Sequence, residues 1–299
     1  TLSCQRPAPS PPTVPAARPV PPMPAVGAVF LGGTDTHTCT GAVVHSAPGD
    51  LVLTAAHCLE AQYPATFVPG FDGHNGPADV WHIDTVYLDP RWVTSQDPAA
   101  DYAFARVSRP AGGKVEAVAG SALVLGTAPG EGTDVTITGY PLGVGGAPVG
   151  CRSVTGPAAE GYPSLRCGGL VDGTSGAPWI SGPAAVGVVG GLDGGGCDDS
   201  LSFTPRFDGR TAAGFHAVMA TNVLGPLMKV RAFLAHLGRA RPGIVVNIGS
   251  RQAGRARAAN VIDTAGDRAA ILSAVRRAVS PAFRSTLSGL VNPNGDGPA

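Results

Sequence analysis

Two short segments carry side chains that could together perform nucleophilic catalysis. Residues 54–58, Thr-Ala-Ala-His-Cys, follow an apolar run typical of a buried strand, so His57 should be held rigidly. Residues 173–178, Gly-Thr-Ser-Gly-Ala-Pro, place Ser175 between small neighbours. Such neighbours let a carbonyl group approach the backbone N–H groups around the serine, as an oxyanion hole requires.

An acidic residue is needed to complete this chemistry. A serine hydroxyl is a poor nucleophile until a base takes its proton, and the base needs a buried carboxylate to hold its tautomer and stabilise its charged form. Asp101 stands at the start of the apolar run Asp-Tyr-Ala-Phe-Ala and is the best candidate. Asp72, Asp79 and Asp84 lie in more polar or more irregular stretches.

The elements that must position these residues are predicted to be strands. Between residues 25 and 201 the apolar runs are short, rich in Val and bounded by Gly, Pro, Asp or Ser, as at 25–30, 51–54, 135–138 and 186–189. The chain holds 43 Gly and 29 Pro among 299 residues, which disfavours long helices. We therefore expect a mainly β sandwich or barrel, closed by one helix at residues 224–237.

Composition separates both ends of the chain from this region. Residues 1–25 are rich in proline and predict an extended surface arm that continues no strand ladder. The formal net charge of zero hides a basic tail, with nine Arg and three Asp from Arg239 onward. The tail predicts a strand at 244–248 and a helix at 267–279, hence a small α/β appendage. We expect three regions: 1–25, 26–238 and 239–299.

Cysteine usage indicates the compartment. The six cysteines include no Cys-x-x-Cys pair, so disulfides are favoured over zinc, and an exported protein is expected whose signal has been removed. The sequence contains no run of eighteen apolar residues, so no membrane-spanning helix is expected. The remaining histidines show no metal-ligand spacing; they are His37, His45, His74, His82, His216 and His236.

The segments around His57, Asp101 and Ser175 resemble the motifs of trypsin-like (chymotrypsin-fold) serine peptidases, particularly bacterial exported ones. Thr-Ala-Ala-His-Cys matches the histidine motif, Asp-Tyr-Ala is similar to the aspartate motif, and Gly-Thr-Ser-Gly-Ala-Pro is similar to Gly-Asp-Ser-Gly-Gly-Pro. The order His, Asp, Ser is the family's order. The resemblance spans about residues 26–238 and implies a two-barrel β fold with a C-terminal helix.

The resemblance also implies roles. His57 would be the general base and acid, Asp101 its orienter and Ser175 the nucleophile, with the N–H groups of Gly173 and Ser175 as the oxyanion hole. Two residues depart from the pattern. Thr174 replaces an aspartate that pairs with a new N-terminus, so activation by N-terminal insertion is not expected; Ala177 replaces a glycine and adds only a methyl group.

A specificity pocket and three disulfides follow from the same resemblance. The pocket would be lined by the 188–192 strand and its neighbours, namely Gly169, Leu170, Val189, Gly190, Gly191 and Leu192. Gly169 stands where trypsin-type enzymes carry an acid, which argues against cleavage after Arg or Lys, although Asp193 lies nearby. Six cysteines allow 15 pairings. The resemblance supports Cys39 with Cys58, favours Cys151 with Cys167, and leaves Cys4 with Cys197.

The tail resembles a different family. Residues 242–255, 260–263 and 292–299 are similar to the C-terminal part of hydrolysing UDP-N-acetylglucosamine 2-epimerases, and Arg251 resembles an arginine near the nucleotide diphosphate. A complete epimerase needs two α/β domains, which this chain lacks. We therefore expect a basic appendage and no working nucleotide site.

The leading hypothesis is an exported serine endopeptidase that acts on polypeptides without metal or cofactor. It predicts no nucleic-acid or membrane partner, and it leaves the oligomeric state open. The alternative is a catalytically silent binding protein of the same fold, with a basic tail that contacts an anionic or nucleotide-sugar ligand. An α/β-hydrolase is disfavoured because Ala177 stands where its nucleophile turn needs Gly.

Overall fold

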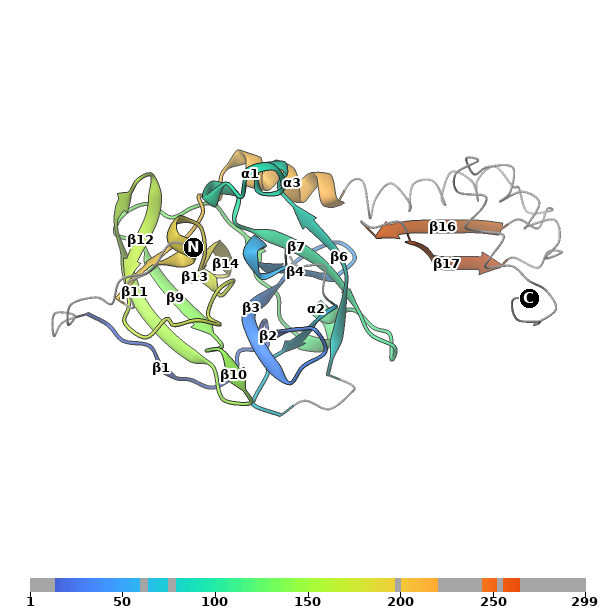
Figure 1. Cartoon of the computed structure of the whole chain (residues 1–299), viewed down its shortest axis with the longest axis horizontal. Helices are drawn as coiled ribbons and strands as arrows, with labels where there is room; N and C mark the ends of the chain where they lie inside the picture. Colours follow the sequence, from blue (N-terminus) through green and yellow to red (C-terminus); the bar gives the residue numbers. More distant parts are fainter. Residues whose placement is uncertain are drawn as a thin grey trace. The chain divides into compact units, whose positions relative to one another are not determined.

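The computed structural model describes residues 14–59, 64–74, 79–196, 200–219, 244–251 and 255–263. The chain divides into two compact units, Thr1–Val223 and Leu224–Ala299, and each is described by itself (Figure 1). The helices expected at 224–237 and 267–279 and the pairing of Cys4 with Cys197 lie outside the described residues. Within the described part of the chain, no helix is long and apolar enough to cross a membrane.

Six strands of the first unit close into a barrel. Their order is β3, β2, β5, β6, β7 and β4, and β4 pairs back with β3, so no edge is left open. The short strand β10 (Gly143–Val144) pairs with the beginning of β3. The barrel strands are β2 (Val26–Leu31), β3 (Thr36–Val44), β4 (Leu51–Thr54), β5 (Ala65–Pro69), β6 (Trp81–Leu88) and β7 (Ala103–Ser108).

A second sheet follows in the chain. Its strands run in the order β15, β12, β11, β9, β13, β14 and β8, and β1 pairs with β11. Together with the closed barrel it confirms the mainly β, two-barrel architecture expected from the sequence. The bounds are β1 (Arg18–Pro19), β8 (Val124–Leu125), β9 (Asp134–Gly139), β11 (Val149–Ala159), β12 (Tyr162–Arg166), β13 (Pro178–Ser181), β14 (Ala184–Val188) and β15 (Leu201–Phe203).

One apolar cluster joins the two sheets. It contains Val26 and Phe104 from the barrel together with Ile180 and Val188 from the second sheet, all buried. Burial of such side chains contributes about 1.5 to 3 kcal/mol each relative to exposure. The hydrophobic effect therefore holds the two sheets against each other, as it also stabilises the core of each sheet.

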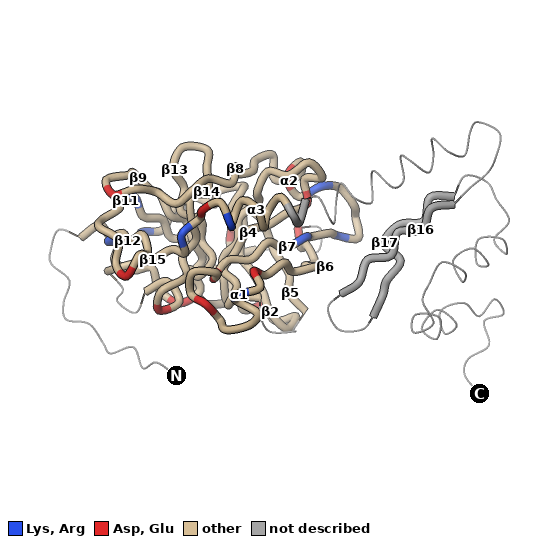
Figure 2. The backbone as a smooth tube through the Cα atoms, turned by 90° about the horizontal axis from the view of Figure 1, so that it is seen from above, with Lys and Arg blue, Asp and Glu red and all other residues tan. Residues whose placement is uncertain are grey.

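Two of the expected disulfides are confirmed. Cys39 is bonded to Cys58 within the barrel, and Cys151 is bonded to Cys167 in the second sheet. In the described residues no cysteine is free. Charged residues of both signs are interspersed along the first unit (Figure 2).

The proline-rich arm departs from its prediction. From residue 14 onward it lies on the second sheet, where Arg18 pairs with Gly150 and Pro19 with Val149 of β11. Val20 also donates its N–H to the carbonyl of Pro148. Proline is compatible with a short edge strand because the missing N–H is not needed there. The expectation that the arm continues no ladder was wrong.

The helices are few and short. They are α1 (Pro90–Ser95), α2 (Val115–Ala119) and α3 (Gly209–Met219), with 3-10 turns η1 (Ala56–Cys58), η2 (Pro98–Ala100) and η3 (Leu192–Gly195). Helix α3 was not predicted because Gly209, Gly214 and the small or polar residues between them produce no wide apolar stripe. Phe215 anchors it by packing on Phe104, with ring centroids 5.1 Å apart.

The described part of the second unit is an antiparallel pair, β16 (Ile244–Arg251) and β17 (Arg255–Asp263). Its register runs from Ile244 opposite Asp263 to Arg251 opposite Arg255. The strand expected at 244–248 is confirmed and extends three residues further. The resemblance of this region to an epimerase fragment stays a prediction.

Gly27 provides a test of the barrel packing. A Cβ atom at this position of β2 would overlap the Val68 carbonyl oxygen and the Phe67 ring. We expect Gly27→Ala to lower the free energy of unfolding by about 1 to 3 kcal/mol through overpacking. Gly130→Ala, where a Cβ would meet no atom within 4 Å, is the control and should change it by less than about 0.5 kcal/mol. Equal chemical denaturation midpoints for the two variants would contradict this packing.

Candidate active site

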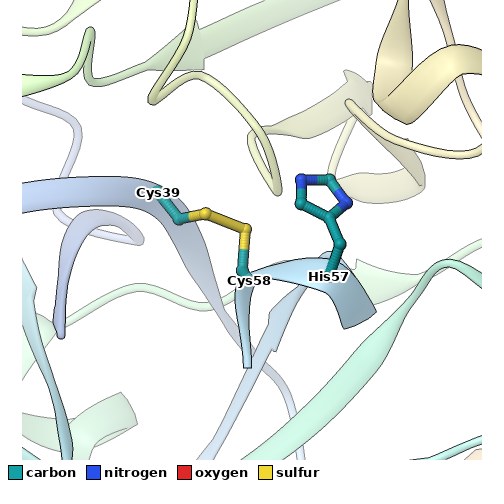
Figure 3. A group of neighbouring side chains, drawn as sticks. All are labelled: Cys39, His57 and Cys58. Carbon is teal, nitrogen blue, oxygen red and sulfur yellow. A yellow bond between two sulfur atoms is a disulfide. The ribbon is translucent and has the colours of Figure 1, made fainter. Parts of the chain in front are cut away.

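His57 is held at the point where a buried strand ends. All four residues of β4 are buried, and the chain then turns through η1, in which Ala56 and Cys58 are buried. The disulfide of Cys58 to Cys39 ties this turn to β3. The His57 side chain is 28% exposed, and its ring lies beside the disulfide (Figure 3), with a ring nitrogen within 4.8 Å of both sulfur atoms. The sequence thus fixes the backbone on both sides of a histidine that reaches the surface.

Asp101 lies under the His57 ring and is 1% exposed. Its Oδ2 is 2.8 Å from His57 Nδ1 and accepts the N–H of Gly191 at 2.8 Å, while its Oδ1 accepts the N–H of His57 at 3.0 Å. An ionised carboxylate only accepts hydrogen bonds, so Nδ1 carries a proton, and in the neutral ring the lone pair is then on Nε2. This is the tautomer that a general base requires.

The charge of Asp101 is stabilised in place. Burial raises the pKa of this carboxyl, but the hydrogen bond and charge of His57 and the N–H groups of Gly191 and His57 lower it. The lowering effects win, and the pKa lies below its usual range. Asp101 is therefore ionised at neutral pH although it is buried.

A network that the sequence did not reveal supports the segment before Asp101. Asp89 caps the start of α1, pairs with Arg91 at 2.9 Å and accepts the hydroxyl of Tyr102 at 2.8 Å. The hydrogen bond from Arg91 is the main reason that the pKa of Asp89 falls to about 2. Tyr102 directly follows Asp101, so the network fixes the backbone beside the orienting carboxylate. The only local signal was Asp before Pro at a helix start.

The Ser175 loop lies against the segment that carries His57. A Cβ atom at Gly176 would overlap Thr54 and the Thr40 carbonyl and approach the Ala55 N to 2.9 Å. Gly176 also has φ +80°, a conformation that favours glycine. Ser175 is partly exposed. The serine and histidine motifs, more than a hundred residues apart, are thus brought together.

The backbone N–H groups of Gly173 and Ser175, the expected oxyanion hole, have no backbone acceptor in the described residues. The carbonyls of the same two peptide groups are fixed, since Asp172 accepts the N–H of Leu142 at 2.7 Å and Thr174 accepts that of Ala177 at 2.9 Å. The two N–H groups are therefore fixed in orientation and available to an external oxygen.

The two departures from the family motif both fit the structure. Thr174 is buried, and its hydroxyl donates to the Val171 carbonyl at 2.7 Å, so it closes the loop without a charge. Ala177 is fully buried, and its methyl group faces Gly139. A glycine at 139 leaves the room that the extra methyl group needs.

The expected pocket residues lie in two places: Gly169 and Leu170 lie near the arm and the second sheet, and residues 189–191 lie near Ala177 and Asp101. Gly169 (φ +83°) lies beside Ala17 of the arm, and Leu170 packs on the cluster of the second sheet. Val189 is buried and pairs with Ala177, whereas Gly190 and Gly191 lie against Asp101. The strand expected at 188–192 ends at Val188, and Leu192 begins η3. The glycines at 190 and 191 thus support the carboxylate; their lining of a pocket stays a prediction.

Two other features do not add to this site. A hollow of about 270 Å³ on the first unit is lined by residues such as Pro22, Trp81 and Arg109 and by none of the candidate site residues. In the described residues, one group has metal-ligand atoms close together, namely Cys39, His57 and Cys58. Because its two sulfur atoms form a disulfide, it offers no thiolate to a metal.

Known structures share this architecture. The protease Anisep from Arthrobacter nicotinovorans has 22% identity and a TM-score of 0.59, covering 69% of this chain and all of its own. The thermostable serine protease AL20 from an extremophilic microorganism has 22% identity and a TM-score of 0.54 over 67% and 98% of the two chains. Human heparin binding protein has 18% identity and a TM-score of 0.50 over 65% and 92%. No curated protein matches the sequence.

The fold is that of the chymotrypsin-like serine proteases. The family profile described as Trypsin matches residues 17–206, more than half of the 299 residues, and the chain belongs to this family. It is accordingly a hydrolase of the serine endopeptidase type.

Asp101→Asn tests the role of the carboxylate. The asparagine oxygen, in place of Oδ1, can still accept the His57 N–H. Its NH₂, in place of Oδ2, would meet the Gly191 N–H and Nδ1, which removes an acceptor and favours the wrong tautomer of His57. We expect turnover of a fluorescent casein to fall by roughly four orders of magnitude at neutral pH. Asp134→Asn, at an exposed acid on β9, should retain wild-type turnover.

The same variant should lose a pH-dependent part of its stability. A folded-state pKa below the ordinary value of 3.8 means that ionised Asp101 stabilises the fold above that pH. The contribution is lost as the pH falls through the folded-state pKa. The difference in unfolding free energy between wild type and Asp101→Asn should therefore shrink on acidification below pH 3.8; a difference that grows would contradict the hydrogen-bonded carboxylate.

Proposed function

We propose that this chain is an exported endopeptidase that cleaves polypeptides through Ser175, His57 and Asp101. The observation that carries the proposal is the set of three N–H donors on the buried Asp101 carboxylate, one of them His57 Nδ1. The Ser175 loop lies directly against the same His57 segment. A structural histidine needs no buried ion beneath it, whereas a general base that becomes charged does.

The reaction begins with acylation. Ser175 Oγ bonds to the carbonyl carbon of the substrate, and its proton passes to His57 Nε2. The carbonyl oxygen becomes negative and accepts the N–H groups of Gly173 and Ser175. The C–N bond then breaks, its nitrogen takes the proton from His57, and the amine product leaves.

Hydrolysis of the acyl-enzyme repeats these steps with water. The water oxygen attacks the acyl carbon and gives a proton to His57 Nε2. The bond from carbon to Ser175 Oγ breaks, and Oγ recovers that proton while the acid product leaves. Asp101 stays ionised and stabilises the imidazolium in both halves. Every proton is accounted for without a cofactor.

Specificity and activation follow from two residues. Gly169, with no side chain, provides no anion for Arg or Lys, so we propose that the substrate residue before the cleaved bond is not basic. Thr174 closes its own loop through Val171. This favours a nucleophile loop that needs no newly formed N-terminal amine.

Export is supported by the covalent chemistry. The bonds Cys39–Cys58 and Cys151–Cys167 are each worth about 2 to 4 kcal/mol, and such bonds persist in oxidising compartments. The silent binding protein considered above is not favoured, because binding alone requires neither the oriented histidine nor the two available N–H groups.

Ser175→Ala tests the nucleophile. Wild type should be labelled by phenylmethylsulfonyl fluoride on the peptide that contains Ser175 and should hydrolyse a fluorescent casein. Ser175→Ala should lose the label and nearly all turnover, because no acyl-enzyme can form. Ser153→Ala, at a partly exposed serine on β11, is the matched control and should retain both. Absence of labelling in folded wild-type protein would support the silent binding protein instead.

Removal of the tail tests the proposed division of labour. The basic tail belongs to a separate compact unit, and no candidate site residue lies in it. We expect a chain that ends after Arg241 to hydrolyse casein within a few-fold of the full chain, and the full chain to release no UDP from UDP-N-acetylglucosamine. Loss of hydrolysis in a folded truncated chain would place the tail in the catalytic unit. UDP release would show a working epimerase site.

A further inference from the structure

Thr40 is a fully buried residue of β3 that follows the disulfide-bonded Cys39. Its hydroxyl accepts the N–H of Tyr140 at 2.8 Å and lies 3.0 Å from the Gly173 carbonyl oxygen. An N–H can only donate, so the hydroxyl uses a lone pair toward Tyr140 and points its one proton at Gly173. Both contacts are consistent with a single orientation of the Thr40 hydroxyl.

The backbone of Thr40 contacts the same loop. Its N–H donates to the Ser175 carbonyl at 2.8 Å, and its carbonyl accepts the Thr54 hydroxyl at 2.7 Å. Thr54 is the first residue of the histidine segment. Thr40 therefore connects the Gly173 carbonyl, the Ser175 carbonyl and the His57 segment through its own three polar groups.

The Gly173–Thr174 peptide group lies between the two oxyanion donors. Its N–H donates to the Val171 carbonyl at 3.0 Å, and its C=O accepts the Thr40 hydroxyl. The peptide groups on either side are held by backbone donors, Leu142 N–H and Ala177 N–H. The central carbonyl is thus held by a side chain, so a point substitution can release it.

Tyr140 extends the influence of Thr40 to the first donor. The Thr40 hydroxyl fixes Tyr140, and Leu142, two residues further on, fixes the Asp172 carbonyl. The Asp172–Gly173 peptide group carries the Gly173 N–H. One hydroxyl therefore holds the peptide group next to the Gly173 donor and, through Tyr140 and Leu142, supports the peptide group that carries this donor.

We propose that Thr40 is a positioning residue for the oxyanion hole: its hydroxyl holds the Gly173 and Ser175 N–H groups at the geometry that acylation requires. The inference rests on the proposed function. All contacts of Thr40 with the loop join uncharged groups, as does the closure of the loop by Thr174. Thr40 thereby supplies a neutral brace to a nucleophile loop in which residue 174 carries no charge.

The test compares Thr40→Val with Thr40→Ser. Valine keeps the shape and removes the hydroxyl, whereas serine keeps the hydroxyl. The probe is p-nitrophenyl acetate, because the burst of nitrophenol reports acylation of a serine by a small ester. Thr40→Val should acylate at least about tenfold more slowly with little change in KM, and Thr40→Ser should stay within about threefold of wild type.

Thr155→Val is the matched control. The Thr155 hydroxyl is also buried, accepts a backbone N–H from Thr133 and donates to the Gly130 carbonyl, but it lies on β11 outside the loop. The Thr155→Val variant should lower the melting temperature as Thr40→Val does and leave the acylation rate unchanged. Equal acylation rates in Thr40→Val and Thr155→Val would overturn the proposal, since Thr40 would then be only a stabilising residue.

A second variant and a hydrogen-exchange measurement test the same role of Thr40 independently. If Thr40→Val does not fold, Thr40→Ala is the second variant, since it removes the hydroxyl and puts no methyl group in its place beside Gly173. The same tenfold loss in acylation rate is expected. Hydrogen exchange of residues 171–177, followed by mass spectrometry, reports the brace without any reaction. Faster exchange in Thr40→Val than in Thr155→Val supports the brace, and equal exchange overturns it. Failure of wild type to give a burst or a sulfonyl label counts against the proposed function itself.

Discussion

The buried carboxylate of Asp101 is the constraint on which the rest of the molecule depends. An ion removed from water must be compensated by donors, and unpaired it costs several kcal/mol. Here one donor residue, His57, comes from the closed barrel, while Gly191 follows β14 of the second sheet. The ion is satisfied only when both sheets are in contact, and the shared apolar cluster keeps them so.

Local sequence was sufficient where a short segment carries its own chemistry. The mainly β architecture, the bonds Cys39–Cys58 and Cys151–Cys167, and the trypsin-like family were predicted and are confirmed. His57 and Asp101 do lie together. The catalytic assignment of these residues and of Ser175, the pocket and the epimerase-like tail stay predictions.

Contacts between distant positions could not be predicted from local sequence patterns. Thr40 sits in a strand where threonine is ordinary, and only the tertiary structure places its hydroxyl on Gly173. Likewise the many prolines of residues 1–25 predicted an arm outside any strand ladder, whereas Arg18 and Pro19 pair with β11. Asp89 shows only the local pattern of a helix start, and its hydrogen bond with Tyr102 spans thirteen positions. In each case the contact depends on which groups the tertiary structure brings together, and hydrophobic periodicity does not encode it.

The long separation between Thr40 and its partner on the loop has a consequence for biosynthesis. The hydroxyl and the Gly173 carbonyl are 133 positions apart, so this bond can form only after most of the chain has emerged and both sheets have docked. Contacts of such span are entropically costly and form late. A nascent or half-folded chain would lack an assembled site. Proteolytic activity would then appear only when folding is complete, which would limit cleavage of other newly made copies during their synthesis.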